Sequence, residues 1–344
     1  MGSVKRVIME VPPGERVTGV GRFEFGDGFS VFDIGDMKID IPRKGEALCL
    51  FGAKTFELLE KEGIPTHYIG LVDNRGKSVR LDELEEPTNK MRIKGLNVPE
   101  PKYKKPGEPM NYEGYKQEKV RVIPLEVIIR PKIPVSASIR KRKSPQDLGF
   151  KYEDWPDKTI IPEKPIVEFS TKFESSDRYI SNEEAMQLSG LSEEELQTVV
   201  NYTERIGQII TNHCRSVGLE HEDGKLEFGI ANGELMVVDV AGTPDENRFT
   251  RNGKSFSKQI LRNWYKNNDP LWCRYVDVSK ELARERGIVD FRDVCVVKAK
   301  ELPRKLANLV GMAYQAGENI YAKDLFPVRP LDSIMDDIYS EFNV

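Results

Sequence analysis

Glu227 and Asp239 are the residues whose types and spacing most directly suggest chemistry. They stand in the apolar runs 225–229 and 235–239, with Asn232-Gly233 between them. Asn-Gly between two such runs is the strongest short signal for a β-hairpin. The hairpin would place both carboxylates on adjacent antiparallel strands, where they can share one Mg²⁺ that keeps waters and the oxygens of a nucleoside triphosphate. The alternative is that both acids are only the polar positions of a solvated hairpin.

Length and charge narrow the class of protein. A chain of 344 residues predicts two domains or lobes. The net charge of -4 and the absence of a basic tail argue against nucleic-acid binding and favour small-molecule or protein partners. The sequence has no run of 18 apolar residues and no apolar signal segment, so we expect a cytoplasmic protein without a membrane partner. The four cysteines form no Cys-x-x-Cys pair, which predicts reduced thiols rather than a zinc site.

The first half of the chain reads as β-rich. Short β-like runs at 4–11, 16–25 and 29–32 predict a small antiparallel sheet, and residues 51–62 predict a helix that ends before Gly63. Residues 85–119 are rich in Pro, Lys and Glu, which predicts a long surface loop or insertion. The continuous apolar run 120–129 predicts a buried strand. We place the lobe boundary there, giving lobes at 1–122 and 123–344.

The second half mixes helices with the hairpin. Ser192 and Glu195 form a capping-box pattern at the start of a helix that runs to Gly218 and carries His213, which we interpret as structural. Helices are also predicted at 256–265, 278–286 and 303–316. The fold class is therefore α+β: a β-rich antiparallel N-terminal lobe and a mixed C-terminal lobe whose carboxylate-bearing hairpin is framed by helices.

The order of short motifs along the chain resembles the SAICAR synthetase (phosphoribosylaminoimidazole-succinocarboxamide synthase) family. The motifs are Ser30-Val-Phe-Asp33, Ile41-Pro-Arg-Lys-Gly45, Thr66-His67, Pro124-Leu-Glu-Val-Ile-Ile-Arg130, Ser138-Ile-Arg-Lys-Arg142, Ser170-Thr-Lys172, Lys225-Leu-Glu-Phe-Gly229, Asp239, Thr243-Pro-Asp-x-x-Arg248-Phe and Ser255-Phe-Ser-Lys-Gln259-x-x-Arg262. Each motif is weak alone, but together they cover most of the chain in the family's order.

The resemblance implies a two-lobed ATP-binding fold and an ATP-dependent ligase. The family joins the carboxylate of carboxyaminoimidazole ribotide to the amine of L-aspartate and releases ADP and phosphate. A carboxylate is a poor electrophile, so the γ-phosphoryl group must first be transferred to it, with metal ions and cations stabilising the charge that develops. The implied cofactors are ATP and Mg²⁺, and a homo-oligomer is left open.

The resemblance also implies roles for individual residues. Glu227 and Asp239 match the magnesium ligands, and Leu125 and Glu126 match a connection that lies against the adenine. The matches to substrate-binding positions are Arg130, Ser138, Lys172 and Arg248, and the matches to catalytic positions are Lys258 and Asp245. Arg130 and Arg248 would hold the ribotide phosphate, because arginine supplies forked donors suited to it. Their simpler readings are a surface charge for Arg130 and a local turn salt bridge for Arg248.

The chain departs from the family pattern where a lysine usually contacts the nucleotide phosphates. The matching stretch is Gly19-Val20-Gly21-Arg22, so either Arg22 takes the phosphate role or Gly21 lets the backbone approach. Val240 and Ser257 also replace usual acids. These departures leave two alternatives: a related ligase for another carboxylate and amine, and a non-catalytic nucleotide-binding descendant. The retained acids and arginines argue against the second.

Overall fold

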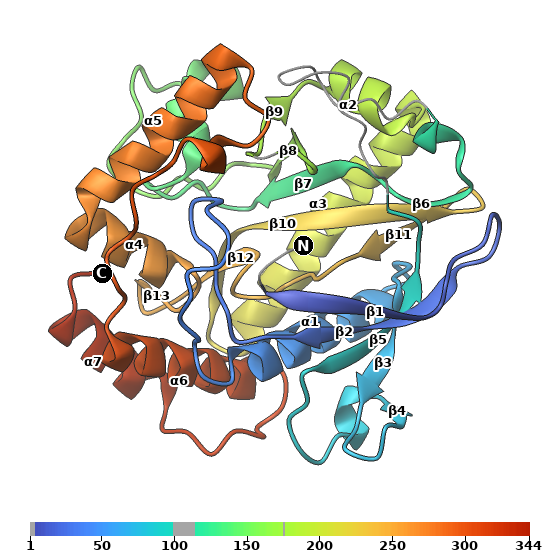
Figure 1. Ribbon diagram of the computed structural model, residues 1–344, viewed down its shortest axis with the longest axis horizontal. Helices are drawn as coiled ribbons and strands as arrows, with labels where there is room; N and C mark the ends of the chain where they lie inside the picture. The colour runs from blue at the N-terminus through green and yellow to red at the C-terminus, as the bar shows by residue number, and fades with distance from the viewer. Residues whose placement is uncertain (1–3, 99–113, 175) are drawn as a thin grey trace.

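Two antiparallel β-sheets organise the chain in the computed structural model, which describes residues 4–98, 114–174 and 176–344 (Figure 1). The first sheet has the strand order β1-β2-β5-β3-β4. Its strands are β1 (Lys5–Val11), β2 (Gly19–Phe25), β3 (Tyr68–Val72), β4 (Ser78–Val79) and β5 (Lys90–Gly95). This confirms the small antiparallel sheet at the start of the chain.

The first sheet buries one face against helix α1 (Lys44–Lys61). On β2, Phe23 and Phe25 point into the core and alternate with Arg22 and Glu24 on the other face. The predicted helix therefore exists but begins earlier than residue 51, and it ends before Gly63 as expected, with φ at 74°.

Two other expectations for the first half are wrong. Residues 29–32 form no strand, because Phe32 and Asp33 both adopt left-handed φ angles of 56° and 65° that end an extended run. The segment 85–119 is not one long loop, because β5 lies inside it and occupies the middle of the first sheet. Met91 and Ile93 supply its buried face, while Lys90, Arg92 and Lys94 alternate with them and hide that pattern in the composition. Residues 99–113 of the segment lie outside the described residues.

The second sheet combines the β10–β11 hairpin with strands that precede it and strands that follow it in the sequence. Its main path is β13-β12-β10-β7-β8-β9, and β6 and β11 also pair with β10. The strands are β6 (Val120–Val122), β7 (Leu125–Arg130), β8 (Ile166–Thr171), β9 (Tyr179–Ile180), β10 (Glu220–Ala231), β11 (Glu234–Val238), β12 (Asn247–Arg251) and β13 (Lys254–Ser255). Since β6 pairs with β10, the division between the two sheets lies before Val120 rather than after residue 122.

Helix α3 (Glu193–Ser216) covers one face of the second sheet, next to β10, β7 and β8 (Figure 1). Its start confirms the predicted capping box of Ser192 and Glu195. His213 lies on this helix, with Nε2 2.7 Å from the backbone oxygen of Tyr321, in the structural role expected. The opposite face of the sheet stays free of α3, so polar side chains on alternate positions of β7, β8 and β10 can gather there.

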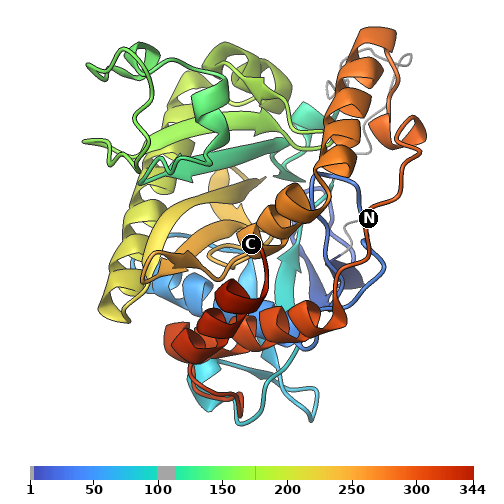
Figure 2. The same cartoon turned by 90° about the vertical axis from the view of Figure 1, so that its left-hand side faces the viewer.

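The remaining helices surround this framework. They are α2 (Asn182–Ser189), α4 (Gln259–Asn268), α5 (Pro270–Arg286), α6 (Arg304–Tyr321) and α7 (Leu331–Glu341), with short 3-10 turns η1 (Leu81–Glu83), η2 (Tyr115–Gln117), η3 (Ser138–Lys141), η4 (Gln146–Leu148) and η5 (Phe291–Asp293). Figure 2 shows α5, in orange, at one edge of the molecule and α6 and α7, in red, along another.

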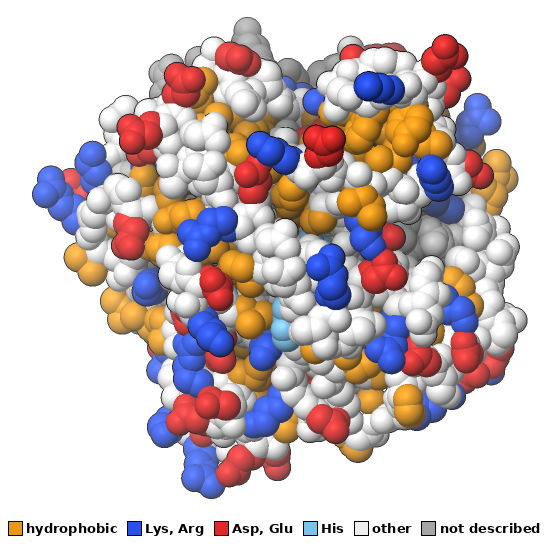
Figure 3. Space-filling view, turned by 180° about the vertical axis from the view of Figure 1, so that it is seen from behind, with side chains coloured by type: hydrophobic (Ala, Val, Ile, Leu, Met, Phe, Trp, Pro, Cys, Tyr) orange, Lys and Arg blue, Asp and Glu red, His pale blue; other side chains and the backbone are white. Residues whose placement is uncertain are grey.

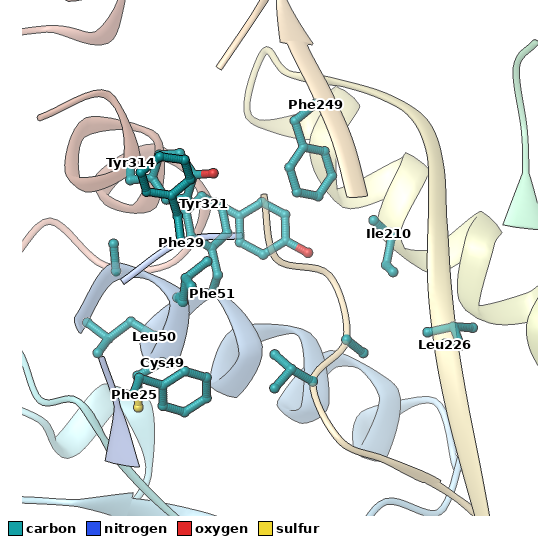
Figure 4. Packing of buried hydrophobic residues seen from close by; sticks show 14 of the residues in the cluster. Phe25, Phe29, Cys49, Leu50, Phe51, Ile210, Leu226, Phe249, Tyr314 and Tyr321 are labelled. Carbon is teal, nitrogen blue, oxygen red and sulfur yellow. The ribbon is translucent and has the colours of Figure 1, made fainter. Parts of the chain in front are cut away.

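One hydrophobic core joins the two sheets. It contains α1 and α6 side by side, and Figure 4 shows Phe51 of α1 beside Tyr321 of α6 and Phe249 of β12. Their ring centroids lie 4.9 Å (Phe51 to Tyr321) and 5.8 Å (Phe249 to Tyr321) apart. The N-terminal and C-terminal parts therefore share a packed interior at this point.

The surface charges and the cysteines complete the description of the fold. On the face shown in Figure 3, Lys and Arg side chains are interspersed with Asp and Glu. Within the described ranges, no helix combines the length and apolar character needed to cross a membrane. Cys49, Cys214, Cys273 and Cys295 are all free thiols, as predicted.

Candidate functional site

The predicted hairpin forms, and it brings its two acids together. Asn232 and Gly233 adopt φ angles of 53° and 86°, the positive values that a type I′ turn requires at both positions. Glu227 of β10 pairs with Val238 of β11, and Asp239 follows directly. The two carboxylates therefore stand at the end of the hairpin away from the turn.

Two lysines surround Glu227. Lys172, just after β8, forms a salt bridge with Glu227 Oε2, and Lys225 Nζ lies 3.6 Å from Glu227 Oε1 and 2.7 Å from Glu126 Oε1. Burial and the nearby charge of Asp239 raise the pKa of Glu227, against the opposing effect of the two lysines. Glu227 is therefore a buried acid that depends on cations around it for its charge.

Asp239 is held by a residue of β1 and by the residue that precedes β3. Lys5 Nζ of β1 lies 2.7 Å from Asp239 Oδ1, and His67 Nε2 lies 3.0 Å from the Asp239 backbone oxygen. That contact supports Asp239 in a left-handed conformation with φ at 62°. Burial alone would raise the pKa of Asp239, but Lys5, Lys172 and Lys225 hold it well below the usual range. Burial lowers the pKa of His67 to about 4, so its ring is neutral at pH 7.

The donor set around the two acids suits a metal that comes with a nucleotide. Across the described residues, no three His, Cys, Asp or Glu side chains gather where they could hold a metal by themselves. Mg²⁺ characteristically uses one or two protein carboxylates together with waters and phosphate oxygens. Glu227 and Asp239, each compensated by a lysine here, fit that arrangement.

A cavity of about 400 Å³ opens beside these acids, against the sheet face that α3 leaves free. Side chains of β7, β10, the segment 244–248 and α4 line it. Among the predicted site residues it contains Glu126, Arg130, Ser138, Asp245, Arg248 and Lys258. Segments far apart in the sequence thus contribute to one space.

Arg130 is buried at the base of this cavity, not a surface charge. Its side chain is 2% exposed, with Nε 2.8 Å from Glu168 Oε2 and one terminal nitrogen 2.6 Å from Asp223 Oδ2. The other terminal nitrogen, Nη2, lies 3.4 Å from both Ser138 Oγ and Tyr179 Oη. Two buried acids therefore fix Arg130, and one edge of its guanidinium stays directed at hydroxyl groups.

Arg248 shares Asp223 with Arg130. Arg248 Nε and Nη2 donate to the two Asp223 oxygens at 2.7 and 2.5 Å, and Nη1 donates to Ser136 Oγ at 2.9 Å. Asp223 pairs with Arg248 across β10 and β12, so this is a cross-strand contact rather than the local turn salt bridge considered above. Burial would raise the pKa of Asp223, but Arg248 and Arg130 outweigh it and lower the value.

Asp245 is fixed by one residue of α1 and one residue of α6. Asp245 Oδ2 accepts from Lys44 Nζ at 2.8 Å, and Oδ1 accepts from Tyr314 Oη at 2.8 Å. Lys44 is completely buried. Burial of Asp245 would raise its pKa, but the positive charges of Lys44 and Lys258 outweigh this effect and lower the pKa to about 2. Asp245 is therefore a rigidly placed carboxylate at pH 7.

Lys258, Arg262 and Lys266 form a row of cations that lines the cavity. They follow one another at four-residue spacing at the start of α4 and along it, so they share one helix face. No salt bridge within the described part of the chain involves any of the three. Burial, opposed by Asp245 and reinforced by Arg262, lowers the pKa of Lys258. This row offers uncompensated positive charge to an anionic ligand.

Glu227, Asp239 and Lys172 lie next to the cavity without lining it, and Arg22 and the Leu125 side chain lie away from it. Arg22 lies on the face of β2 away from Phe23, within 3.2 Å of Glu10 and 3.1 Å of Glu24. A Cβ atom at Gly21 would lie 2.8 Å from Met9 Sδ. Met9 therefore occupies the space beside Gly21 in which the nucleotide phosphates were expected to approach the backbone. Leu125 is fully buried in the core.

Sequence reasoning assigned no role to several residues of this region. Lys5 contacts Asp239, Lys44 contacts Asp245, and Asp33, Asp177 and Glu246 line the cavity. Lys44 and Asp33 lie in motifs that the sequence already singled out, whereas Lys5 stands in a short β-run with no distinguishing pattern.

The two other departures from the family pattern have packing roles. Val240 is buried against α1, close to Gly52, and Ser257 is buried with its hydroxyl 2.9 Å from Ser255 Oγ. Ser257 also lines the cavity, whereas Val240 does not. Both substitutions are therefore accommodated by local packing.

Comparison with known proteins is consistent with these features. The family model described as SAICAR synthetase matches residues 16–277. A protein of Archaeoglobus fulgidus, provisionally named phosphoribosylaminoimidazole-succinocarboxamide synthase, is 41% identical over 295 residues, covering 83% of this chain and 84% of the relative. The synthase of that name from Thermoplasma volcanium is 33% identical over 307 residues, covering 83% and 90%.

Solved structures show the same fold. The SAICAR synthase of Saccharomyces cerevisiae complexed with SAICAR matches with a TM-score of 0.64 at 21% identity, over 95% of both chains. A SAICAR synthetase (Type-2) in complex with ADP matches with a TM-score of 0.55 at 22% identity, over 88% of this chain and 99% of that one.

Proposed function

Because the chain belongs to the SAICAR synthetase family, we propose that it forms an amide between carboxyaminoimidazole ribotide and L-aspartate, using ATP. The observation that carries the proposal is a cavity that is lined by unpaired cations and lies next to the hairpin acid pair, because Lys225 lines the cavity and its Nζ is 3.6 Å from Glu227 Oε1. The acid pair suits a metal-bound nucleotide, and the cations suit anionic substrates. The 41% identical relative favours this reaction over the two alternatives raised by the sequence.

The acids of the hairpin are proposed to hold the metal. Glu227 and Asp239 would be its protein ligands, and the bound Mg²⁺ would neutralise charge on the phosphates of ATP. Lys5 and Lys172, which compensate the two carboxylates here, lie where they can stabilise charge that develops as a phosphoryl group moves to the substrate carboxylate. We therefore assign to Lys5 the phosphate contact that the sequence predicted for Arg22.

An apolar cluster beside the hairpin is proposed to receive the nucleotide base. Leu96, Val122, Met236 and Val238 pack together separately from the main core. Val238 directly precedes Asp239, so the cluster adjoins the metal ligands along the chain. The segment assigned to the adenine by resemblance follows Val122 directly, and Leu125 and Glu126 could contribute through their backbone groups.

The ribotide phosphate and the aspartate carboxylates need several cations. Arg130 and Arg248 share Asp223, which leaves Arg130 Nη2 near Ser138 and Arg248 Nη1 at Ser136 as donors for a phosphate. The row on α4 supplies further positive charge for carboxylates. These groups are proposed to bind and orient both substrates.

Lys258 and Asp245 are proposed to act beside the reacting groups. Burial lowers the pKa of Lys258 from that of an ordinary lysine, and the side chain lines the cavity. Asp245, fixed by Lys44 and Tyr314, is placed to orient Lys258 by its negative charge. Lys258 would then stabilise the negative charge that develops on the reacting carboxylate.

The test is an assay of purified protein with MgATP, carboxyaminoimidazole ribotide and L-aspartate, followed for ADP and for the amide product. We expect both products in equal amounts and only when all three substrates are present. ADP formation with another amine or carboxylate, and none with these two, would support a related ligase. Absence of turnover despite ATP binding would support the non-catalytic alternative.

The metal assignment has its own test. Asp239→Asn should reduce turnover by more than tenfold, about 1.4 kcal/mol in the barrier. It should also weaken calorimetric binding of MgATP more than binding of ATP in excess chelator. Glu234→Gln, at an exposed acid on the other end of β11, is the matched control. Equal effects on ATP with and without Mg²⁺ would contradict a metal role for Asp239.

A further inference from the structure

A tyrosine, Tyr179 of β9, lines the cavity beside Arg130 and Ser138. It stands outside the motifs that carry the family resemblance and has no part in the function proposed above. Strand β9 ends the main path of the second sheet, and Tyr179 pairs there with Ser170 of β8 (Figure 1). The last strand of the sheet therefore brings a phenol to the end of the cavity where Arg130 lies.

The hydroxyl of Tyr179 forms a triangle with two polar groups of the cavity. Tyr179 Oη lies 3.4 Å from Arg130 Nη2 and 3.2 Å from Ser138 Oγ, and Arg130 Nη2 lies 3.4 Å from Ser138 Oγ. These separations exceed the usual range for such hydrogen bonds, whereas the other nitrogens of Arg130 contact Glu168 and Asp223 at 2.8 and 2.6 Å. The three groups hold one another weakly, so each can form a stronger hydrogen bond to an anion oxygen placed between them.

The charges around this triangle leave a surplus of positive charge. The three arginines Arg130, Arg142 and Arg248 form salt bridges with only two buried acids, Glu168 and Asp223. Three positive charges against two negative ones leave one positive charge in excess. A phosphate at the triangle is therefore attracted to the cluster rather than repelled by its acids.

Arg142 holds the phenol from the face of its ring. Its guanidinium carbon lies 3.3 Å from the centroid of the Tyr179 ring, and its Nη1 and Nη2 lie 2.9 and 3.2 Å from the two Glu168 oxygens. A cation over an aromatic face is attracted by the ring and draws electron density from it, which makes the phenol a better hydrogen-bond donor. Arg142 directly follows the turn η3 that carries Ser138, so the stack also ties that turn to β9.

We propose, on the basis of the function proposed above, that the Tyr179 hydroxyl binds the phosphate of the ribotide together with Arg130 and Ser138, and that Arg142 is its positioning residue. In the bound state, Tyr179 Oη accepts from Arg130 Nη2 and donates its own proton to a phosphate oxygen. The phenol thus adds a directed donor to the phosphate site without adding a further charge.

Tyr179→Phe tests the hydroxyl alone, because phenylalanine keeps the ring beside Arg142. The ligase assay should show KM for the ribotide raised about fivefold or more, because a hydrogen bond to a charged group is lost, with KM for ATP changed less than about twofold. Binding of ribose 5-phosphate, followed by phosphorus NMR, should weaken by at least the same factor, and this measurement needs no turnover.

Tyr152→Phe is the matched control, because Tyr152 is 41% exposed and lies off the cavity. It should change neither KM nor the binding of ribose 5-phosphate. Thermal unfolding of each variant checks that the protein is folded.

Arg142→Lys tests the positioning role, because lysine keeps the charge but loses the flat guanidinium that stacks on the ring. It should raise KM for the ribotide about threefold or more. Combined with Tyr179→Phe it should add less than about twofold, because Arg142 acts through the hydroxyl that is already absent. Effects that multiply in the double variant would contradict the positioning role.

The outcomes separate the role of Tyr179 from the proposed function. If the wild type turns over and Tyr179→Phe raises KM for the ribotide less than about fivefold, the role of Tyr179 is overturned and the proposed function stands. If the wild type shows no turnover but binds ribose 5-phosphate, weaker binding by Tyr179→Phe supports the role while the function fails, and equal binding overturns both. A wild type with neither turnover nor ribose 5-phosphate binding also overturns both.

Discussion

Glu318 on α6 provides the sharpest test of the energetics of this core. Its side chain is completely buried, Oε1 accepts from the backbone N–H of Lys323 at 3.3 Å, and Oε2 has no partner among the described residues. It lies on the helix whose Tyr314 and Tyr321 pack beside α1 (Figure 4). Burial raises the pKa of Glu318 to about 9, from an ordinary value of 4.5.

The sign of the resulting pH dependence follows from proton binding. Between pH 4.5 and about 9 the folded protein keeps the Glu318 proton while the unfolded chain has lost it. The contribution is fully present below pH 4.5 and is lost as the pH rises toward 9. Each pH unit in this window removes about 1.4 kcal/mol from the free energy of unfolding, or about 2.7 kcal/mol between pH 5.5 and 7.5.

Glu318→Gln removes this titration without changing the shape of the side chain. The free energy of unfolding of the variant relative to the wild type should therefore rise by about 2.7 kcal/mol from pH 5.5 to pH 7.5. The measurement is urea unfolding at both pH values, followed by the fluorescence of the three tryptophans. Glu234→Gln, at an exposed acid, should show no such change. A Glu318→Gln difference that is the same at both pH values would refute a buried, protonated Glu318.

Three further predictions concern the site. Lys5→Met should weaken MgATP binding by about 1.5–3 kcal/mol, the range for hydrogen bonds to charged groups. Arg22→Met is the control and should leave MgATP binding unchanged in calorimetry. The reverse pattern would return the phosphate contact to Arg22. Arg248→Lys should raise KM for the ribotide with little effect on ATP, because lysine keeps the charge but loses the forked donors. Equal changes for both substrates would move Arg248 to the nucleotide. Lys44→Met should destabilise the protein by about 3–5 kcal/mol, since it leaves Asp245 buried without its cation; a loss below about 1 kcal/mol in thermal unfolding would contradict that pairing.

Features that depend on neighbouring residues were predictable from the sequence. The hairpin turn at Asn232-Gly233, the capping box before α3 and the helix end at Gly63 each depend on the conformational preferences of a few adjacent residues. Hydrophobic periodicity likewise identified α3, and the helices predicted at 256–265 and 303–316 overlap α4 and α6, whereas the one predicted at 278–286 covers only the second half of α5. The order of motifs then indicated the family, which the comparisons confirm.

Strand β5 shows where local pattern was not enough. Its six residues include only Met91 and Ile93 as large apolar side chains, between charged neighbours in a segment of polar composition. What makes it a strand is hydrogen bonding to β2 on one side and β3 on the other. Neither partner is adjacent in sequence, so no short window contained the information.

The site itself was decided in part by the sequence and in part only by the tertiary structure. Residue types and motif order alone identified Glu227 and Asp239 as an acid pair and Arg248 as a conspicuous cation. Which cation stands beside Asp239 depended on the relative placement of the two sheets, which brings Lys5 there and turns Arg22 to the far face of β2. Contacts between charges depend on distance in space, and a chain read in one dimension carries that distance only for residues a few positions apart.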